Sequence, residues 1–173
     1  MFDRDAALRA LEALASELDS RGVVAHVFVV GGAAMTLAFD ARRMTRDIDA
    51  VFEPKLAVYS AAHAVAEQLE LPDDWLNDAV KGFVPGTDPD ALPIFDRPSL
   101  HVSAASARFL LAMKLQAARV EQDAGDIRFL ANLLGLHTPE AVLDVARERY
   151  DISELPARAR FLVEQVFGDQ EPS

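Results

Sequence analysis

The hydrophobic pattern of the first seventy residues alternates between helical and strand periodicity. Leucines spaced three or four apart in residues 8–18 predict an amphipathic helix. The short β-branched run VVAHVFVV, residues 23–30, predicts a strand buried on both faces, and a double glycine ends it. We expect a second helix to begin at these glycines, a second strand in RDIDAVFE, residues 46–53, and a third helix in residues 55–71.

The pattern changes in the middle of the chain. Residues 72–98 are rich in Pro, Asp and Gly and predict a long irregular connection, a kind of loop that often forms a lid or a substrate wall. SLHVSAAS, residues 99–106, predicts a third strand, and helical periodicity continues from there to the end. The expected fold is therefore α/β (α+β), with an α/β core in residues 1–105 and an all-helical part in residues 106–173 packed on it.

Composition narrows the class of protein. Of the 173 residues, 51% are hydrophobic and 26% are charged, as in ordinary globular domains. The net charge of −11 argues against broad, non-specific nucleic-acid binding, which requires a basic surface. The absence of cysteine excludes disulfides and thiolate chemistry. We expect no membrane span, because no apolar run is long enough, and no signal peptide, so the predicted location is the cytoplasm.

Two aspartates occupy alternate positions in the predicted strand of residues 46–53. Asp47 and Asp49 should point to one face of the sheet, while Ile48 and Ala50 face the core. Their Cα atoms would lie about 7 Å apart, so both carboxylates could reach one Mg²⁺ or Mn²⁺ ion. The alternative is an edge strand with both acids in solvent, paired with nearby arginines such as Arg46.

Gly31 and Gly32 join the first strand to the helix that follows. A strand that ends at a double glycine and opens a helix presents backbone N–H groups and a positive helix end to an anion. Glycines at such a turn can also serve the backbone alone. The dinucleotide-binding fingerprint needs a third glycine, which this sequence lacks. Together with the aspartates, the glycines predict a binding site for a metal-bound polyphosphate.

This combination resembles the nucleotidyltransferase superfamily of the DNA-polymerase-beta type, in which a glycine pair follows the first strand and Asp-x-Asp lies on the next. The matching positions are Gly31, Gly32, Asp47 and Asp49. The string RMTRDID looks closer still to the AbiEii-type toxin nucleotidyltransferases, whose Arg-x-Thr-x-Asp-x-Asp is matched by Arg43, Thr45, Asp47 and Asp49. That branch also has a lysine-bearing helix followed by an aspartate, matched by Lys114 and Asp126.

The resemblance implies transfer of a nucleoside monophosphate from an NTP to an RNA (tRNA) or protein acceptor, with release of pyrophosphate. It further implies a small mixed sheet, a bacterial toxin–antitoxin context and a cognate antitoxin as partner. Asp47 and Asp49 would bind Mg²⁺ or Mn²⁺, and the glycines would hold the phosphates together with Thr45. Arg43 or Arg46 would offer a bidentate fork to phosphate oxygens, and Lys114 a point charge.

One departure from the family pattern leaves alternatives open. The superfamily usually has a third carboxylate on a neighbouring strand, and residues 99–106 contain none. Asp126 or Asp96 could replace it, or it is missing. A missing carboxylate would favour a degenerate module that binds nucleotide or a protein partner without chemistry. A sugar-nucleotide transferase is a third reading, because Asp-x-Asp also holds metal-bound sugar diphosphates.

Several of these residues also have purely structural readings. Lys114 interrupts an apolar face and could be structural. Asp123 and Asp126 could cap the next helix, with Asp126 in the first turn of a helix that starts near residue 125. Trp75 is expected to be a core anchor, with base stacking as the alternative. His26 and His101 are expected to serve packing or hydrogen bonding.

Overall fold

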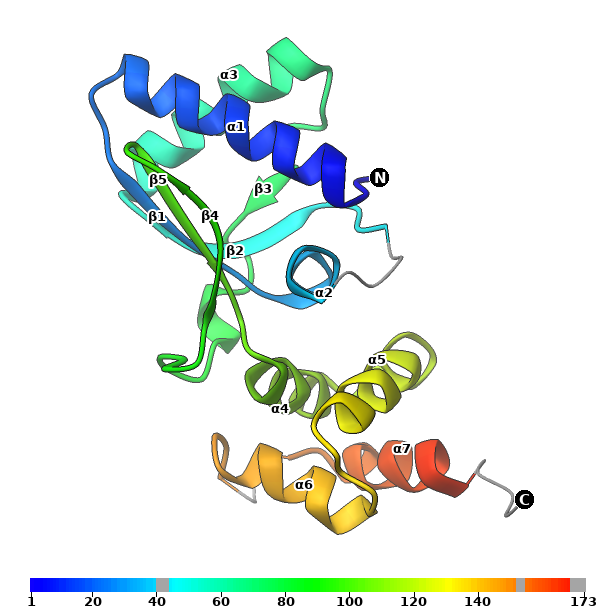
Figure 1. The fold of residues 1–173 in the computed structure, drawn as a ribbon. Coiled ribbons are helices and arrows are strands. Elements are labelled where there is room, and N and C mark those ends of the chain that lie inside the picture. Colours follow the sequence, from blue (N-terminus) through cyan, green and yellow to red (C-terminus); the bar gives the residue numbers. More distant parts are fainter. Residues whose placement is uncertain (40–43, 152–154, 169–173) are drawn as a thin grey trace. The chain divides into compact units, whose positions relative to one another are not determined.

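The computed structural model describes residues 1–39, 44–151 and 155–168, which form a mixed α+β fold (Figure 1). The described residues contain five β-strands in one sheet and seven α-helices, and the last four helices follow the sheet. This confirms the predicted fold class. The chain forms two compact units, a first unit of residues 1–82 and 89–105 and a second unit of residues 83–88 and 106–173.

The first unit holds the sheet and three α-helices. In chain order its elements are α1 (Arg4–Ser20), β1 (Ala25–Val29), α2 (Gly31–Ala38), β2 (Ile48–Glu53), α3 (Lys55–Leu69), β3 (Leu76–Asn77), β4 (Leu92–Arg97) and β5 (Leu100–Ala104). A short 3₁₀ helix, η1 (Lys81–Phe83), follows β3. The second unit contains α4 (Ala107–Ala117), α5 (Val120–Leu133), α6 (Pro139–Arg147) and α7 (Ala157–Gly168).

The strand order in the sheet is β3-β2-β1-β5-β4. The β1–β2 and β4–β5 pairs are antiparallel, whereas β1–β5 and β2–β3 are parallel. Helices α1 and α3 lie side by side against one face of this sheet (Figure 1). The buried strand residues on that face include Val27, Ile48, Ala50 and Val102.

The opposite face of the sheet carries the polar side chains. Along β1, burial alternates: His26 is exposed and Phe28 half-buried, although their neighbours are buried. The prediction that this strand is buried on both faces is therefore wrong, because the described helices of the first unit cover only one of them. Asp49 and Val51 of β2 share the open face, so the sheet follows the half-buried pattern that alternating residues produce.

The prediction of a wholly irregular connection between residues 72 and 98 is also wrong. It contains β3, which pairs with β2, and β4, which forms an antiparallel ladder with β5. The β4 sequence LPIFDR has no simple alternation, and the ladder shifts register between Pro93 and Phe95. Proline and a bulge are typical of an edge strand, since an edge has no second ladder to break.

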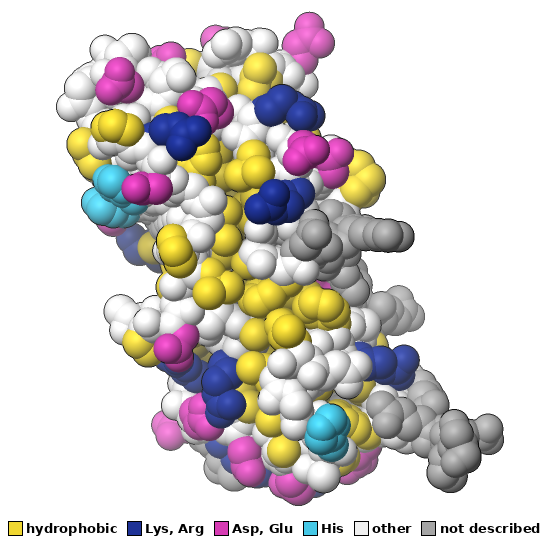
Figure 2. All heavy atoms as spheres, viewed as in Figure 1, with side chains coloured by type: hydrophobic (Ala, Val, Ile, Leu, Met, Phe, Trp, Pro, Cys, Tyr) yellow, Lys and Arg dark blue, Asp and Glu magenta, His cyan; other side chains and the backbone are white. Residues whose placement is uncertain are grey.

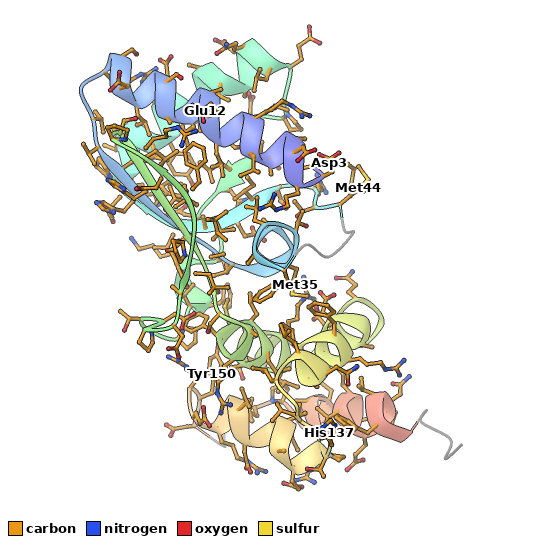
Figure 3. The ribbon with its side chains drawn as sticks, viewed as in Figure 1. Asp3, Glu12, Met35, Met44, His137 and Tyr150 are labelled. Carbon is orange, nitrogen blue, oxygen red and sulfur yellow. The ribbon has the colours of Figure 1, made fainter. Side chains whose placement is uncertain are left out.

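The start of α1 is tied to the segment that precedes β2. The carboxylate of Asp3 caps the helix by accepting a hydrogen bond of 2.7 Å from the Ala6 N–H. Just before this cap, Phe2 and Thr45 exchange two backbone hydrogen bonds of 2.6 and 2.8 Å. Figure 3 accordingly shows Asp3 and Met44 close together. The N-terminal residues therefore fix where the chain enters the Asp47–Asp49 segment.

The second unit is helical throughout its described elements. Thr138 caps α6, because its Oγ1 accepts a hydrogen bond of 3.2 Å from the Ala141 N–H, and Pro139 occupies the first helical position. Among the described residues no helix combines the length and apolar character needed to cross a membrane. On the face drawn in Figure 2, basic and acidic side chains of the described residues are interspersed rather than gathered into one basic field.

Candidate active site

The double glycine forms a sharp turn from β1 into α2. Val30 donates a backbone hydrogen bond of 2.9 Å to the Asp49 carbonyl, which holds the turn against β2. Gly31 then takes a φ of +63°, a left-handed conformation that favours glycine. The first N–H groups of an α-helix have no partner within the helix, so α2 directs donors and its positive end toward this turn.

Because the glycines have no side chains, two polar side chains lie close to the backbone of the turn. A Cβ atom built on Gly31 would lie 3.4 Å from Oδ2 of Asp49, and one built on Gly32 would lie 3.2 Å from Oγ1 of Thr45. Because neither glycine has a side chain, backbone, carboxylate and hydroxyl meet at close range. We call Gly31, Gly32, Thr45 and Asp49 the glycine elbow.

Thr45 is a positioning residue in this structure. Its side chain is buried, with 8% exposed, and its Oγ1 donates a hydrogen bond of 2.9 Å to the Asp47 carbonyl. Together with the Phe2 bridge, this bond fixes the backbone that leads to the aspartates. Arg43 lies outside the described residues, and Arg46 is exposed next to Asp47.

Asp47 and Asp49 flank a residue of the core. Ile48 and Ala50 are fully buried, as predicted, while both aspartates are half-buried. Burial raises the pKa of Asp47 above its ordinary value of 3.8, and the negative charges of Asp49 and Asp74 raise it further, against an opposing effect of Arg46. The two carboxylates therefore lie within electrostatic range of each other.

Two polar residues near the aspartates were not predicted from the sequence. Asp74 acts on the charge of Asp47, and Asn77 of β3 is the register partner of Asp49. Both lie in the stretch that was expected to be irregular, so nothing in the sequence pattern indicated that it pairs with β2. The adjacent Trp75 is fully buried and donates a hydrogen bond of 2.9 Å from Nε1 to the Ala62 carbonyl. It is the predicted core anchor, which excludes base stacking on its ring.

The structure does not bring Asp96 to the aspartate pair. Asp96 lies on the edge strand β4, where its Oδ1 is 2.5 Å from Nδ1 of His101. β4 is three strand positions from β2, which corresponds to about 14 Å. Within the described part of the chain, no group of three or more His, Asp or Glu side chains is arranged to hold a metal ion.

Lys114 and Asp126 come together in the second unit. The Lys114 ammonium lies 2.6 Å from Oδ2 of Asp126 and 2.9 Å from Oδ1 of Asp123, and all three residues are buried. Asp126 lies in the middle of α5, so the alternative in which it caps a helix starting near residue 125 is wrong. The helix break falls earlier, at Ala118, which has a φ of 43°. The part that Lys114 and Asp126 would play in nucleotide chemistry stays a prediction.

The fold and this site favour one class of protein. A mixed sheet whose first strand ends in a glycine elbow, with a carboxylate pair on the neighbouring strand, is suited to hold a polyphosphate and a divalent cation. Residues 6–87 match the family model described as "Nucleotidyltransferase of unknown function (DUF6036)". The match includes the elbow and both aspartates and supports a transferase of the nucleotidyltransferase type. No curated protein and no solved structure matches the chain significantly.

Proposed function

We propose that the protein is a metal-dependent nucleotidyltransferase, which moves a nucleoside monophosphate from an NTP to an RNA or protein acceptor. The observation that carries the proposal is the closeness of Gly31 to the Asp49 carboxylate: a Cβ built on Gly31 would lie only 3.4 Å from Oδ2 of Asp49. Phosphate oxygens at the start of α2 would therefore lie beside the group that binds their cation.

The residues present fit a Mg²⁺ or Mn²⁺ ion. Asp47 and Asp49 repel each other, and the pKa of Asp47 is raised in part by that repulsion, so a cation would relieve an existing cost. Mg²⁺ in such sites is commonly held by one or two carboxylates and completed by water and substrate phosphates. Asp47 and Asp49 would hold the ion, which supplies charge neutralisation to the triphosphate when it is bound.

The chain's own residues position the substrate. The N–H groups of Gly31 and Gly32 would donate to phosphate oxygens, and Thr45 would keep the backbone before Asp47 in place. In the transfer, an acceptor oxygen bonds to the α-phosphorus, the bond to pyrophosphate breaks, and the acceptor proton passes to water. Arg46, with Arg43 from outside the described residues, would add positive charge near the phosphates.

The acceptor and the biological setting come from the sequence resemblance alone. We propose tRNA or a protein as acceptor, and the role of a toxin paired with a cognate antitoxin, as in the AbiEii-type enzymes that the chain resembles. Lys114 and Asp126 would serve the reaction from the helical part. A structural role is the alternative for both residues, because their buried ion pair joins α4 to α5.

The test is incubation with Mg²⁺ and each α-labelled NTP, with and without total tRNA. Label transfer to RNA or to protein is the expected result, and it should disappear in Asp49→Asn. The exposed Asp73→Asn is the matched control, because it removes the same charge from a solvent position of the first unit. Transfer that persists in Asp49→Asn would refute the proposal.

The second candidate is a nucleotide-binding module without chemistry. Strand β5 carries no carboxylate, and the described residues form no cluster of three metal-binding side chains. Binding of Mg²⁺ and NTP without transfer to any acceptor, abolished in Asp49→Asn, would favour this reading. The labelling experiment therefore separates the two candidates directly.

A further inference from the structure

A cavity of about 480 Å³ opens on the sheet face that carries Asp49. It lies entirely in the first unit, and β1, β2, β4 and β5 all contribute to it. Its volume falls within the range of about 300–1,000 Å³ of small-molecule sites. The residues that line it include His26, Phe28, Val51, Glu53, Asp96 and His101.

The cavity begins next to the candidate active site on the same face of the sheet. Val51 follows Asp49 on the same face of β2, and Phe28 is its register partner on β1. Same-face neighbours along a strand are about 7 Å apart. A ligand whose phosphates sit at the glycine elbow could therefore extend along the sheet and place its remaining part in the cavity.

The polar groups at the rim of the cavity are hydrogen-bond acceptors, so they suit a ligand that carries donors. His101 Nδ1 lies 2.5 Å from the Asp96 carboxylate, so this nitrogen carries the proton and, in the neutral ring, Nε2 is left as an acceptor. Glu53 and Asp96 add carboxylate oxygens, and no lysine or arginine belongs to the described lining.

The inner surface of the cavity is suited to a flat ring. The imidazoles of His26 and His101 are stacked, with ring centroids 5.0 Å apart and planes inclined by 26°. Phe28 and Val51 supply apolar area beside them. Aromatic side chains are good platforms for nucleobases because every base has a π-face.

We infer that this cavity binds the nucleobase of the NTP and selects a base that carries an exocyclic amino group. The location of the phosphates in this inference rests on the proposed function. The amino group would donate to the Glu53 carboxylate or to the acceptors of the Asp96–His101 pair. Uracil presents the carbonyl oxygen O4 at the position of cytosine's amino group and would face those acceptors without that donor.

A basic side chain of a partner protein is the competing occupant. Glu53 already lies 3.6 Å from the Lys81 ammonium, and Asp96 is engaged with His101, so neither carboxylate requires a cation from outside. The continuity with the elbow is explained by a base, whose phosphates would reach Gly31 and Gly32, and not by a guanidinium. These contacts favour the nucleobase.

The test uses nucleosides, which lack phosphates and so do not depend on the elbow or on metal. The chain has only four histidines, of which His26 and His101 line the cavity, while His63 and His137 are exposed elsewhere and serve as internal controls. Cytidine should shift the ring C–H resonances of the first two in an NMR titration and leave the other two unchanged. Uridine, which lacks the amino group, should bind at least about tenfold more weakly.

Two variants separate this inference from the proposed function. Glu53→Gln should reduce the preference for cytidine over uridine, with Glu164→Gln as the control, whereas Asp49→Asn should leave nucleoside binding intact while abolishing Mg²⁺-dependent binding of tripolyphosphate. Equal shifts with cytidine and uridine, or shifts at His63 and His137 alone, would overturn the inference. Binding of arginine amide in place of any nucleoside would overturn it in favour of a protein partner.

Discussion

Replacing Gly31 with alanine tests the elbow, provided that backbone strain is controlled. Gly31 has a φ of +63°, and Gly22, at the end of α1, has a φ of +65°. A non-glycine residue in this conformation costs about 1–2 kcal/mol. A Cβ on Gly22 would meet nothing within 4 Å, whereas one on Gly31 would meet Asp49 Oδ2 at 3.4 Å, an ordinary contact distance.

The two variants should therefore lose similar stability. A loss of about 1–2 kcal/mol corresponds to a fall in Tm of about 2–8 °C for a chain of this size. Their nucleotide binding should differ. In Gly31→Ala the new methyl group occupies the space beside Asp49 that a phosphate oxygen would need, whereas Gly22→Ala leaves the elbow untouched.

The assay is isothermal titration calorimetry of each variant with Mg²⁺ and an NTP. Thermal denaturation is measured first, to check that the two variants have the same stability. Loss of one charge-assisted hydrogen bond to phosphate is worth about 1.5–3 kcal/mol, so Gly31→Ala should bind at least about tenfold more weakly than Gly22→Ala. Equal affinity of the two variants at equal stability would refute a phosphate seat at this turn.

Three further predictions concern charge and burial. Because burial and neighbouring negative charges raise the folded-state pKa of Asp47, the contribution of Asp47 to stability without divalent cations should fall as the pH rises from 3.8 through the raised pKa. Asp47→Asn should lack this contribution and be more stable than the unchanged protein at neutral pH, as measured by denaturation at a series of pH values. Lys114→Met removes the ammonium that lies between the buried carboxylates of Asp123 and Asp126, so urea unfolding should show a loss of up to about 3–5 kcal/mol; a change below about 1 kcal/mol would contradict the burial of this ion pair. Trp75, the only tryptophan, should emit at short wavelength and resist quenching by acrylamide with or without nucleotide, whereas strong quenching by a bound base would contradict its place in the core.

The elbow could be predicted because its determinants are local in sequence. Gly31 at a strand end and Asp49 in an alternating strand each leave a pattern that the backbone must obey, and pairing of consecutive strands brings them together. The same holds for the helix cap at Thr138, where threonine precedes proline. Such features depend on a few neighbouring residues and little on distant packing.

The parts that sequence reasoning missed depend on distant partners. β4 becomes a strand because β5 offers it a ladder, despite Pro93 and its bulge. Asp74 and Asn77 reach the site only because β3 pairs with β2 across α3. The break between α4 and α5 falls at Ala118, a residue type that gives no signal for a left-handed conformation.

The backbone bridge between Phe2 and Thr45 has a practical consequence for protein engineering. Deleting the first few residues would remove one side of this bridge and release the stretch that orients Asp47. A shortened preparation could then lose the proposed activity although the side chains of Asp47 and Asp49 are unchanged. Affinity tags intended for enzymology are therefore better joined through a linker that leaves Phe2 in place.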